Sequence, residues 1–118
     1  MIIGTEWLID AAGCRGAALR DPAALKAVFN RVVVELNLQI VGETRWHQFP
    51  PPGGITGLAL LSESHLACHT YPEHGIATFN LYCCRPRPEW PWADVLSELL
   101  DAQAVSIHAV QRSSAGRR

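Results

Sequence analysis

Residues 55–84 read Ile55-Thr-Gly-Leu-Ala-Leu-Leu61, then Ser62-Glu-Ser-His-Leu-Ala-Cys-His-Thr-Tyr-Pro-Glu73 and, two residues later, Ile76-Ala-Thr-Phe-Asn-Leu-Tyr-Cys-Cys84. The first and third segments are apolar and rich in residues that favour strands. The middle segment holds two serines, two histidines, two glutamates, a cysteine and a tyrosine in twelve positions. We therefore expect two strands that flank the stretch in which the chemistry lies.

Toward the N-terminus, the run Pro50-Pro-Pro-Gly-Gly54 predicts a turn or loop, because proline has no N–H to donate to a neighbouring strand. Leu38–Phe49 is expected to be a strand, and Ile3–Ala11 is expected to be the first strand of the chain. Asp21-Pro22 combines a capping side chain with a proline that suits the first helical position. Apolar residues then recur at helical spacing and predict a helix that ends at Asn37. These residues are Leu25, Val28, Phe29, Val32 and Leu36.

Toward the C-terminus, Trp90-Pro-Trp92 opens a second predicted helix, Val105–Val110 predicts the last strand, and Ser113–Arg118 is expected to be a frayed tail. The element order is β-α-β-β-β-β-α-β or close to it. This order favours an α+β fold, with two helices on one face of a mainly antiparallel sheet in a two-layer sandwich. The other sheet face then needs cover, which favours a dimer.

The 118 residues suit a single domain, residues 1–118, and carry a net charge of -1 without a long basic run. This composition gives no indication of nucleic acid binding. No apolar run approaches the roughly 20 residues that cross a bilayer. Residues 1–10 lack a basic segment and contain Glu6 and Asp10, so export is not expected. We expect a cytoplasmic protein without a membrane partner.

The cysteines and the lysine of the chain indicate which cofactors and bonds to expect. The four cysteines include no CxxC pair and are expected to be free thiols in a reducing compartment. Lys26 is the only lysine and falls in the middle of the first predicted helix. A pyridoxal phosphate enzyme needs a lysine in its pocket, so this cofactor is not expected.

Three kinds of chemistry fit the polar stretch to different degrees. His65, His69 and Glu73 recur every four residues, but no fourth metal ligand is obvious and we predict no metal. A serine hydrolase is disfavoured because Ser64 lacks the flanking glycines of a nucleophile turn. In the third chemistry, the Ser64 hydroxyl attacks the Glu63 carbonyl, and elimination then leaves a pyruvoyl group on a new chain end. That reaction needs a base, for which His69 is plausible, and a donor to the oxyanion. These residues are compatible with the third chemistry, but their spacing alone does not establish it.

The segments Gly57–Gly75 and Asn80–Cys84 closely resemble the short prokaryotic S-adenosylmethionine decarboxylase family. The family pattern is an S-E-S-H-L-x-x-H-T-x-P-E-x-G block followed by a strand that ends in cysteine. The resemblance implies a pyruvoyl-dependent decarboxylase of S-adenosylmethionine that supplies the aminopropyl donor for spermidine synthesis. It also implies self-cleavage between Glu63 and Ser64 into chains 1–63 and 64–118, and a homodimer of processed protomers.

The resemblance also implies roles for individual residues. Ser64 becomes the pyruvoyl group, His69 matches the processing histidine, and Cys84 matches the cysteine that protonates the product carbon. Thr56 falls near the processing serine of the family, so a hydroxyl is kept. The positions matched to the substrate are Phe49 and Tyr71 for adenine and Glu73 for the ribose hydroxyls.

The chain departs from the family pattern at several of the matched positions. Tyr71 replaces the usual tryptophan, Asn80 replaces an aspartate, and Gly4-Thr-Glu-Trp-Leu8 replaces a Gly-x-His opening. Cys83 places a second thiol beside Cys84. Because some relatives decarboxylate L-arginine or L-ornithine, either amino acid is an alternative substrate. An inactive regulatory paralogue is a further alternative, although Ser64, His69 and Cys84 are all intact.

Overall fold

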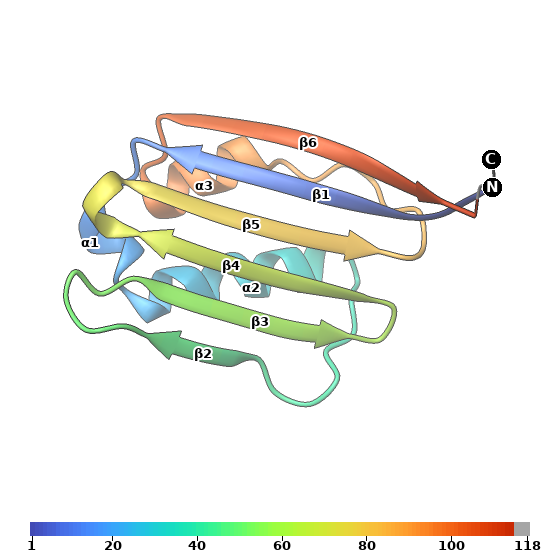
Figure 1. Ribbon diagram of the computed structural model, residues 1–118, viewed down its shortest axis with the longest axis horizontal. Helices are drawn as coiled ribbons and strands as arrows, with labels where there is room; N and C mark the ends of the chain where they lie inside the picture. Colours follow the sequence, from blue (N-terminus) through green and yellow to red (C-terminus); the bar gives the residue numbers. More distant parts are fainter. Residues whose placement is uncertain (115–118) are drawn as a thin grey trace.

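One sheet dominates residues 1–114, which the computed structural model describes. Its strand order is β2-β3-β4-β5-β1-β6, and each neighbouring pair is antiparallel (Figure 1). The strands are β1 (Ile2–Ala12), β2 (Arg45–Gln48), β3 (Ile55–Leu61), β4 (Ser64–Tyr71), β5 (Ile76–Cys83) and β6 (Ala104–Ser113). The mainly antiparallel sheet of the α+β prediction is confirmed.

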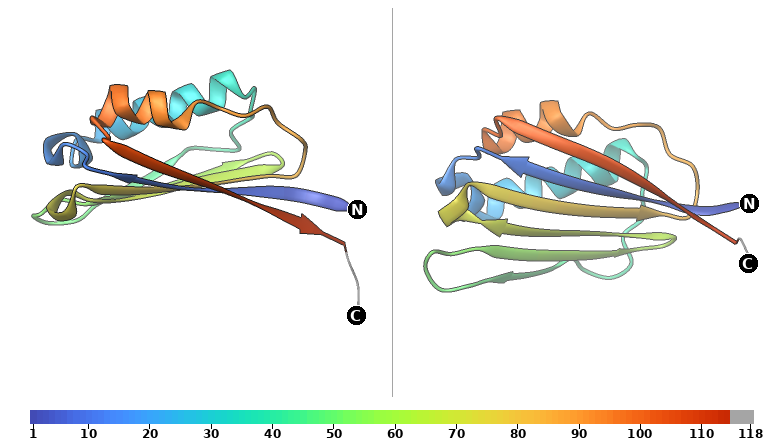
Figure 2. Two further views of the ribbon diagram at one scale, coloured as in Figure 1. Left: turned by 90° about the horizontal axis from the view of Figure 1, so that it is seen from above. Right: turned by 45° about the horizontal axis from the view of Figure 1, so that its top comes forward.

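Two helices, α2 (Pro22–Glu35) and α3 (Trp92–Leu100), cover one face of this sheet and leave the other face open (Figure 2). A short helix, α1 (Gly16–Leu19), precedes α2, and one 3-10 turn, η1 (Pro72–His74), joins β4 to β5. The two-layer sandwich expected from the sequence is therefore present.

The core lies between the sheet and the helices, and β3 shows how side chains alternate between the two faces. Ile55, Ala59 and Leu61 are buried under the helices, whereas Leu58 and Leu60 point away from them and are 49% and 59% exposed. Successive side chains of a strand lie on opposite faces of its sheet. The open face thus carries apolar side chains that are exposed in the described part of the chain, residues 1–114.

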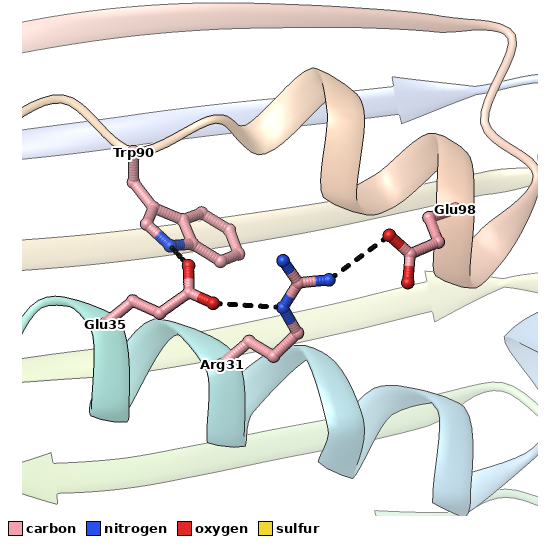
Figure 3. Close-up of polar contacts among 4 residues, drawn as sticks. All are labelled: Arg31, Glu35, Trp90 and Glu98. Carbon is pink, nitrogen blue, oxygen red and sulfur yellow. Dashed lines mark hydrogen bonds and ion pairs between the residues drawn. The ribbon is translucent and has the colours of Figure 1, made fainter.

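Polar contacts fasten α2 to α3 and to the segment before α3 (Figure 3). Arg31 donates through Nε to Glu35 at 3.2 Å and through Nη1 to Glu98 at 3.4 Å. The indole N–H of the buried Trp90 donates to Glu35 at 2.7 Å. Glu35 therefore ties α2 to the segment before α3, and Arg31 ties α2 to α3 itself.

The helix α2 begins as the sequence predicts. The carboxylate of Asp21 accepts a hydrogen bond from the Ala23 N–H at 3.0 Å, and Pro22 occupies the first turn. The helix ends at Glu35, two residues before Asn37, whose left-handed φ of 54° turns the chain away. Asparagine tolerates this conformation better than most residues.

Several predicted boundaries were wrong. The strand expected over Leu38–Phe49 is confined to β2, with one isolated bridge from Ile40 to Leu61. Gly42 interrupts it with a φ of 76°. The one-turn elements α1 and η1 were missed because they are too short for apolar periodicity. In the expected tail, Ser113 belongs to β6, and residues 115–118 lie outside the described residues.

Within the described residues, helices are too short or too polar to cross a membrane.

Glu35 should give the fold a measurable pH dependence. The indole of Trp90, followed by Arg31, lowers the pKa of Glu35. A lowered folded-state pKa contributes stability at neutral pH that is lost as pH falls through that pKa. Glu35→Gln should therefore reduce the free energy of unfolding near neutral pH, and its difference from the parent protein should shrink below about pH 4. Equilibrium urea unfolding at both pH values measures this.

The matched control is Glu43→Gln, because the exposed Glu43 makes no side-chain ion pair with other residues in the 1–114 range. An equal and pH-independent effect of the two substitutions would contradict this role of Glu35.

Candidate active site

Ser64 is the first residue of β4 and follows the tight turn Ser62-Glu63 at the end of β3. It pairs with Leu61 on one side and with Cys83 on the other. The backbone N–H of Cys84 donates to the carbonyl oxygen of Glu63 at 3.0 Å. The register of three strands thus brings the Glu63–Ser64 bond next to Cys84. We call this group, Glu63, Ser64 and Cys84, the Ser64 corner.

The thiols near the Ser64 corner differ sharply in access. Cys84 is exposed, whereas Cys83 faces the core and burial raises the pKa of its thiol. Burial also raises the pKa of the Cys68 thiol, on β4, to about 12. A cavity of about 230 Å³ beside Cys84 is lined also by Thr5 and Gln111. Of the two adjacent thiols, the accessible one is therefore Cys84.

A second group of predicted residues lies at the other end of β3 and β4. The Thr56 hydroxyl and the His69 Nδ1 are 3.2 Å apart, on residues that face each other across the two strands. They line a cavity of about 420 Å³. Its lining includes all the positions matched to substrate binding: Phe49, Tyr71 and Glu73. We call it the aromatic cavity.

Thr70 holds the wall of the aromatic cavity in place and was not singled out from the sequence. Its buried hydroxyl donates to the Leu19 carbonyl at 2.7 Å and accepts from the Ile55 N–H at 2.9 Å. This hydroxyl therefore ties α1 and β3 to β4. Gly54 permits the close approach, because a Cβ there would lie 2.6 Å from the Thr70 carbonyl oxygen. A buried hydroxyl with two partners leaves no pattern in the sequence that could have revealed it.

One protomer does not bring the two groups together. Ser64 and His69 are five residues apart on one strand, which corresponds to about 16 Å at the rise of an extended chain. Their side chains also start from opposite faces of the sheet, because five is an odd number of residues. The residues predicted from the sequence therefore form two separate groups in the chain.

A hydrogen-bonded chain on the open face joins two of the departures from the family pattern. Asn80 donates to Glu6 at 3.1 Å, and its carbonyl oxygen lies 3.1 Å from His65 Nε2. Arg112 also donates to Glu6, and the hydrogen bond from Asn80 contributes most to the lowered pKa of Glu6. Since the Asn80 oxygen can only accept, His65 carries a proton on Nε2. In the sequence, these hydrogen bonds were signalled by two departures from the family pattern that occur together, Glu6 and Asn80.

Metal ligation finds no support in the geometry. Among the described residues, no cluster of three or more His, Cys, Asp or Glu side chains could hold a metal ion. His65 contacts Asn80 and His69 contacts Thr56, so the two histidines have separate partners.

Solved structures and sequence relatives identify the protein class. The crystal structure of the adenosylmethionine decarboxylase from Aquifex aeolicus superposes with a TM-score of 0.81 and 25% identity, over 99% of this chain and 96% of that chain. The fold and site thus define a decarboxylase of the carboxy-lyase class. The family model of S-adenosylmethionine decarboxylase matches residues 5–113. The chain belongs to the S-adenosylmethionine decarboxylase family.

Relatives named S-adenosylmethionine decarboxylase proenzyme match most of the chain. The one from Pyrobaculum arsenaticum is 31% identical over 96% of this chain and 90% of its own length. The one from Geobacillus kaustophilus is 33% identical over 86% of this chain and 80% of its own length.

The difference in access among the thiols can be measured directly. In the folded protein, a thiol-specific chromogenic reagent should modify Cys84 rapidly, because Cys14, Cys68 and Cys83 are buried. The other three should react only after unfolding, since the thiolate is the reactive form and burial disfavours it. Cys84→Ser should abolish the fast phase, whereas Cys83→Ser should leave it intact. A fast phase that persists in Cys84→Ser would contradict this assignment.

Proposed function

We propose that the chain is a self-processing decarboxylase of S-adenosylmethionine that is cut between Glu63 and Ser64, with Ser64 converted into a pyruvoyl group. The observation that carries the proposal is the hydrogen bond from the Cys84 N–H to the Glu63 carbonyl oxygen, at 3.0 Å. This is the carbonyl that the Ser64 hydroxyl must attack. A backbone donor already aimed at it supports processing at this bond.

The Ser64 corner supplies the nucleophile and a donor to the oxyanion for the first step. When Ser64 Oγ adds to the Glu63 carbonyl carbon, negative charge develops on the carbonyl oxygen that accepts from Cys84. Preorganised N–H donors stabilise such an oxyanion because they need no reorganisation during the reaction. Ser64 is half-buried and its backbone is paired with Cys83, which limits its conformational freedom.

A pyruvoyl group supplies an electrophilic carbonyl that withdraws electrons as carbon dioxide leaves the substrate. Such a group would lie close to the Cys84 backbone, whose N–H donates to the adjacent Glu63 carbonyl, and the Cys84 thiol is exposed. In the proposal, Cys84 Sγ delivers the proton that replaces the carboxylate on the substrate carbon. A positioned thiol is a suitable general acid at neutral pH.

The aromatic cavity supports recognition of a nucleoside. Phe49 and Tyr71 are 52% and 42% exposed, which leaves their faces available for stacking on adenine. The exposed carboxylate of Glu73 lies in the same cavity and can accept hydrogen bonds from ribose hydroxyls. Arginine and ornithine have no aromatic base, so this lining favours S-adenosylmethionine. The product would serve as the aminopropyl donor for spermidine synthesis in the cytoplasm.

Two protomers would complete the active site. The open face carries exposed apolar side chains on four strands, and a second copy of the same face would cover them. They are Leu8, Leu58, Leu60, Ile76 and Val110. The row of Leu58, Ala67 and Asn80 lies midway between the rows of His65 and His69. A two-fold axis near this row would set the aromatic cavity of one protomer against the Ser64 corner of its partner.

The proposal is tested by intact mass spectrometry of the denatured protein. The protein is first incubated with equal S-adenosylmethionine, arginine and ornithine and a reductant that traps bound amines. We expect two chains, 1–63 and 64–118, with an adduct from S-adenosylmethionine on the second. Ser64→Ala should remain uncut and without an adduct. An uncut parent chain would overturn the proposal, and an arginine or ornithine adduct would overturn the substrate.

A shared active site predicts complementation between two inactive variants. Ser64→Ala and His69→Ala should each lack activity when they are produced alone. When they are co-expressed, a mixed dimer combines an intact Ser64 corner with an intact aromatic cavity, and part of the activity should return. Decarboxylase activity of the co-purified variants measures this. The matched control is a chain that carries both Ser64→Ala and His69→Ala, co-expressed with His69→Ala. Every pairing of these two chains lacks either an intact Ser64 corner or an intact aromatic cavity, so no activity should return.

A further inference from the structure

Two arginines that follow β5 surround Glu63, the residue that would become a chain end. The Nε of Arg85 forms an ion pair with the Glu63 carboxylate. Arg87, two residues later, is half-buried and donates through Nη1 to the Leu36 carbonyl at 3.3 Å. The Arg85 hydrogen bond, and then the charges of both arginines, lower the pKa of Glu63. Positive charge is thus gathered at the cleavage point.

Cleavage would create a new anion at this point. Attack of Ser64 Oγ on the Glu63 carbonyl carbon, with rupture of the C–N bond, gives an ester and a free amine on Ser64. A base then removes the Ser64 Cα proton, a Cα=Cβ bond forms, and the Cβ–Oγ bond breaks. Glu63 departs as an α-carboxylate, and hydrolysis of the remaining enamine releases ammonia. The leaving group of the elimination is therefore the main-chain carboxylate of Glu63.

We propose that Arg85, backed by Arg87, forms a clamp for this departing carboxylate and thereby promotes the elimination step. The inference rests on the proposed self-cleavage and adds a role that the cleavage does not require. In the precursor, Arg85 uses Nε for the Glu63 side chain, and its two Nη groups can donate further. Guanidinium groups bind carboxylates in a two-pronged geometry that a point charge does not reproduce.

Geometry already directs the new carboxylate toward these donors. Its oxygens include the Glu63 carbonyl oxygen, which the Cys84 N–H holds at 3.0 Å. Arg85 follows Cys84 directly, so the same backbone segment presents the N–H and the guanidinium to one residue. Arg87 adds a buried Nε that has no hydrogen-bond partner within residues 1–114.

An ordinary surface ion pair explains these contacts less well. The Arg85–Glu63 pair is exposed, and such pairs add little to folding stability. The pair nevertheless joins the residue on the N-terminal side of the scissile bond to the segment that carries Cys84. A role in the reaction accounts for the position of this ion pair. The negative charge on Glu63 is greatest when cleavage adds a main-chain carboxylate to the side-chain carboxylate.

The test measures processing of the precursor, made by cell-free synthesis. Samples taken over time are treated with hydroxylamine, which cuts the ester and leaves a hydroxamate on Glu63. Arg85→Gln should slow elimination about tenfold while the ester still forms, so the trapped hydroxamate should accumulate. Arg85→Lys should restore part of the rate, since the charge returns without the fork. Added salt should slow the parent protein and leave Arg85→Gln unchanged. Circular dichroism verifies that each variant folds.

The matched control is Arg15→Gln, which breaks an exposed Arg15–Asp101 pair of 2.8 Å away from Glu63. It should leave the cleavage rate unchanged. An equal loss in the control, or a loss in Arg85→Gln without trapped ester, would overturn the clamp.

A double-mutant cycle separates the two carboxylates of Glu63. In a Glu63→Gln background, the side-chain anion is gone but the main-chain carboxylate still forms on cleavage. If Arg85 acts on the departing group, Arg85→Gln should still slow elimination there by several fold. If the arginine only holds the Glu63 side chain, it should have no further effect, which would overturn the proposal. Failure of the parent chain to cut at all would instead count against the proposed function.

Discussion

The antiparallel pairing of β4 with β3 and β5 is the constraint on which the other features depend. It sets Ser64 opposite Cys83 and His69 opposite Thr56, and it places the Cys84 N–H on the Glu63 carbonyl. In a strand pair, a shift of one residue moves each side chain to the opposite face. Such a shift would expose Leu66 and Cys68, which are fully buried, so the core enforces the register that the site needs.

The one-sided helical cover has consequences for function. Because α2 and α3 lie on the same face, the other face keeps both apolar side chains and the Glu6–Asn80–His65 chain at its surface (Figure 2). Apolar surface of this kind favours association, since its removal from water is the main driving force between proteins. This open face is the surface on which the proposed dimer depends.

The Ser64 corner and the aromatic cavity differ in the charged and polar groups that they contain. The Ser64 corner and the neighbouring Arg85 and Arg87 together hold one carboxylate, two guanidinium groups and a backbone donor, a set that suits the negative charge of the proposed cleavage. The aromatic cavity offers ring faces, a carboxylate and the Thr56–His69 pair, a set that suits a cationic nucleoside. The two groups therefore differ in the chemistry they can offer, and each is built from one end of the same strands.

The sequence by itself determined the strand segments Ile55–Leu61 and Ile76–Cys83, the start of α2 at Asp21-Pro22 and the residues of the candidate site, because these are local patterns or a contiguous motif. It did not reveal the separation of Ser64 from His69, the exposure of Cys84 relative to Cys83, the Thr70 tie or the positions of Arg85 and Arg87 around Glu63. These depend on which strand lies beside which, and in what register. Such pairing joins residues far apart in the chain, so only the tertiary structure decided it.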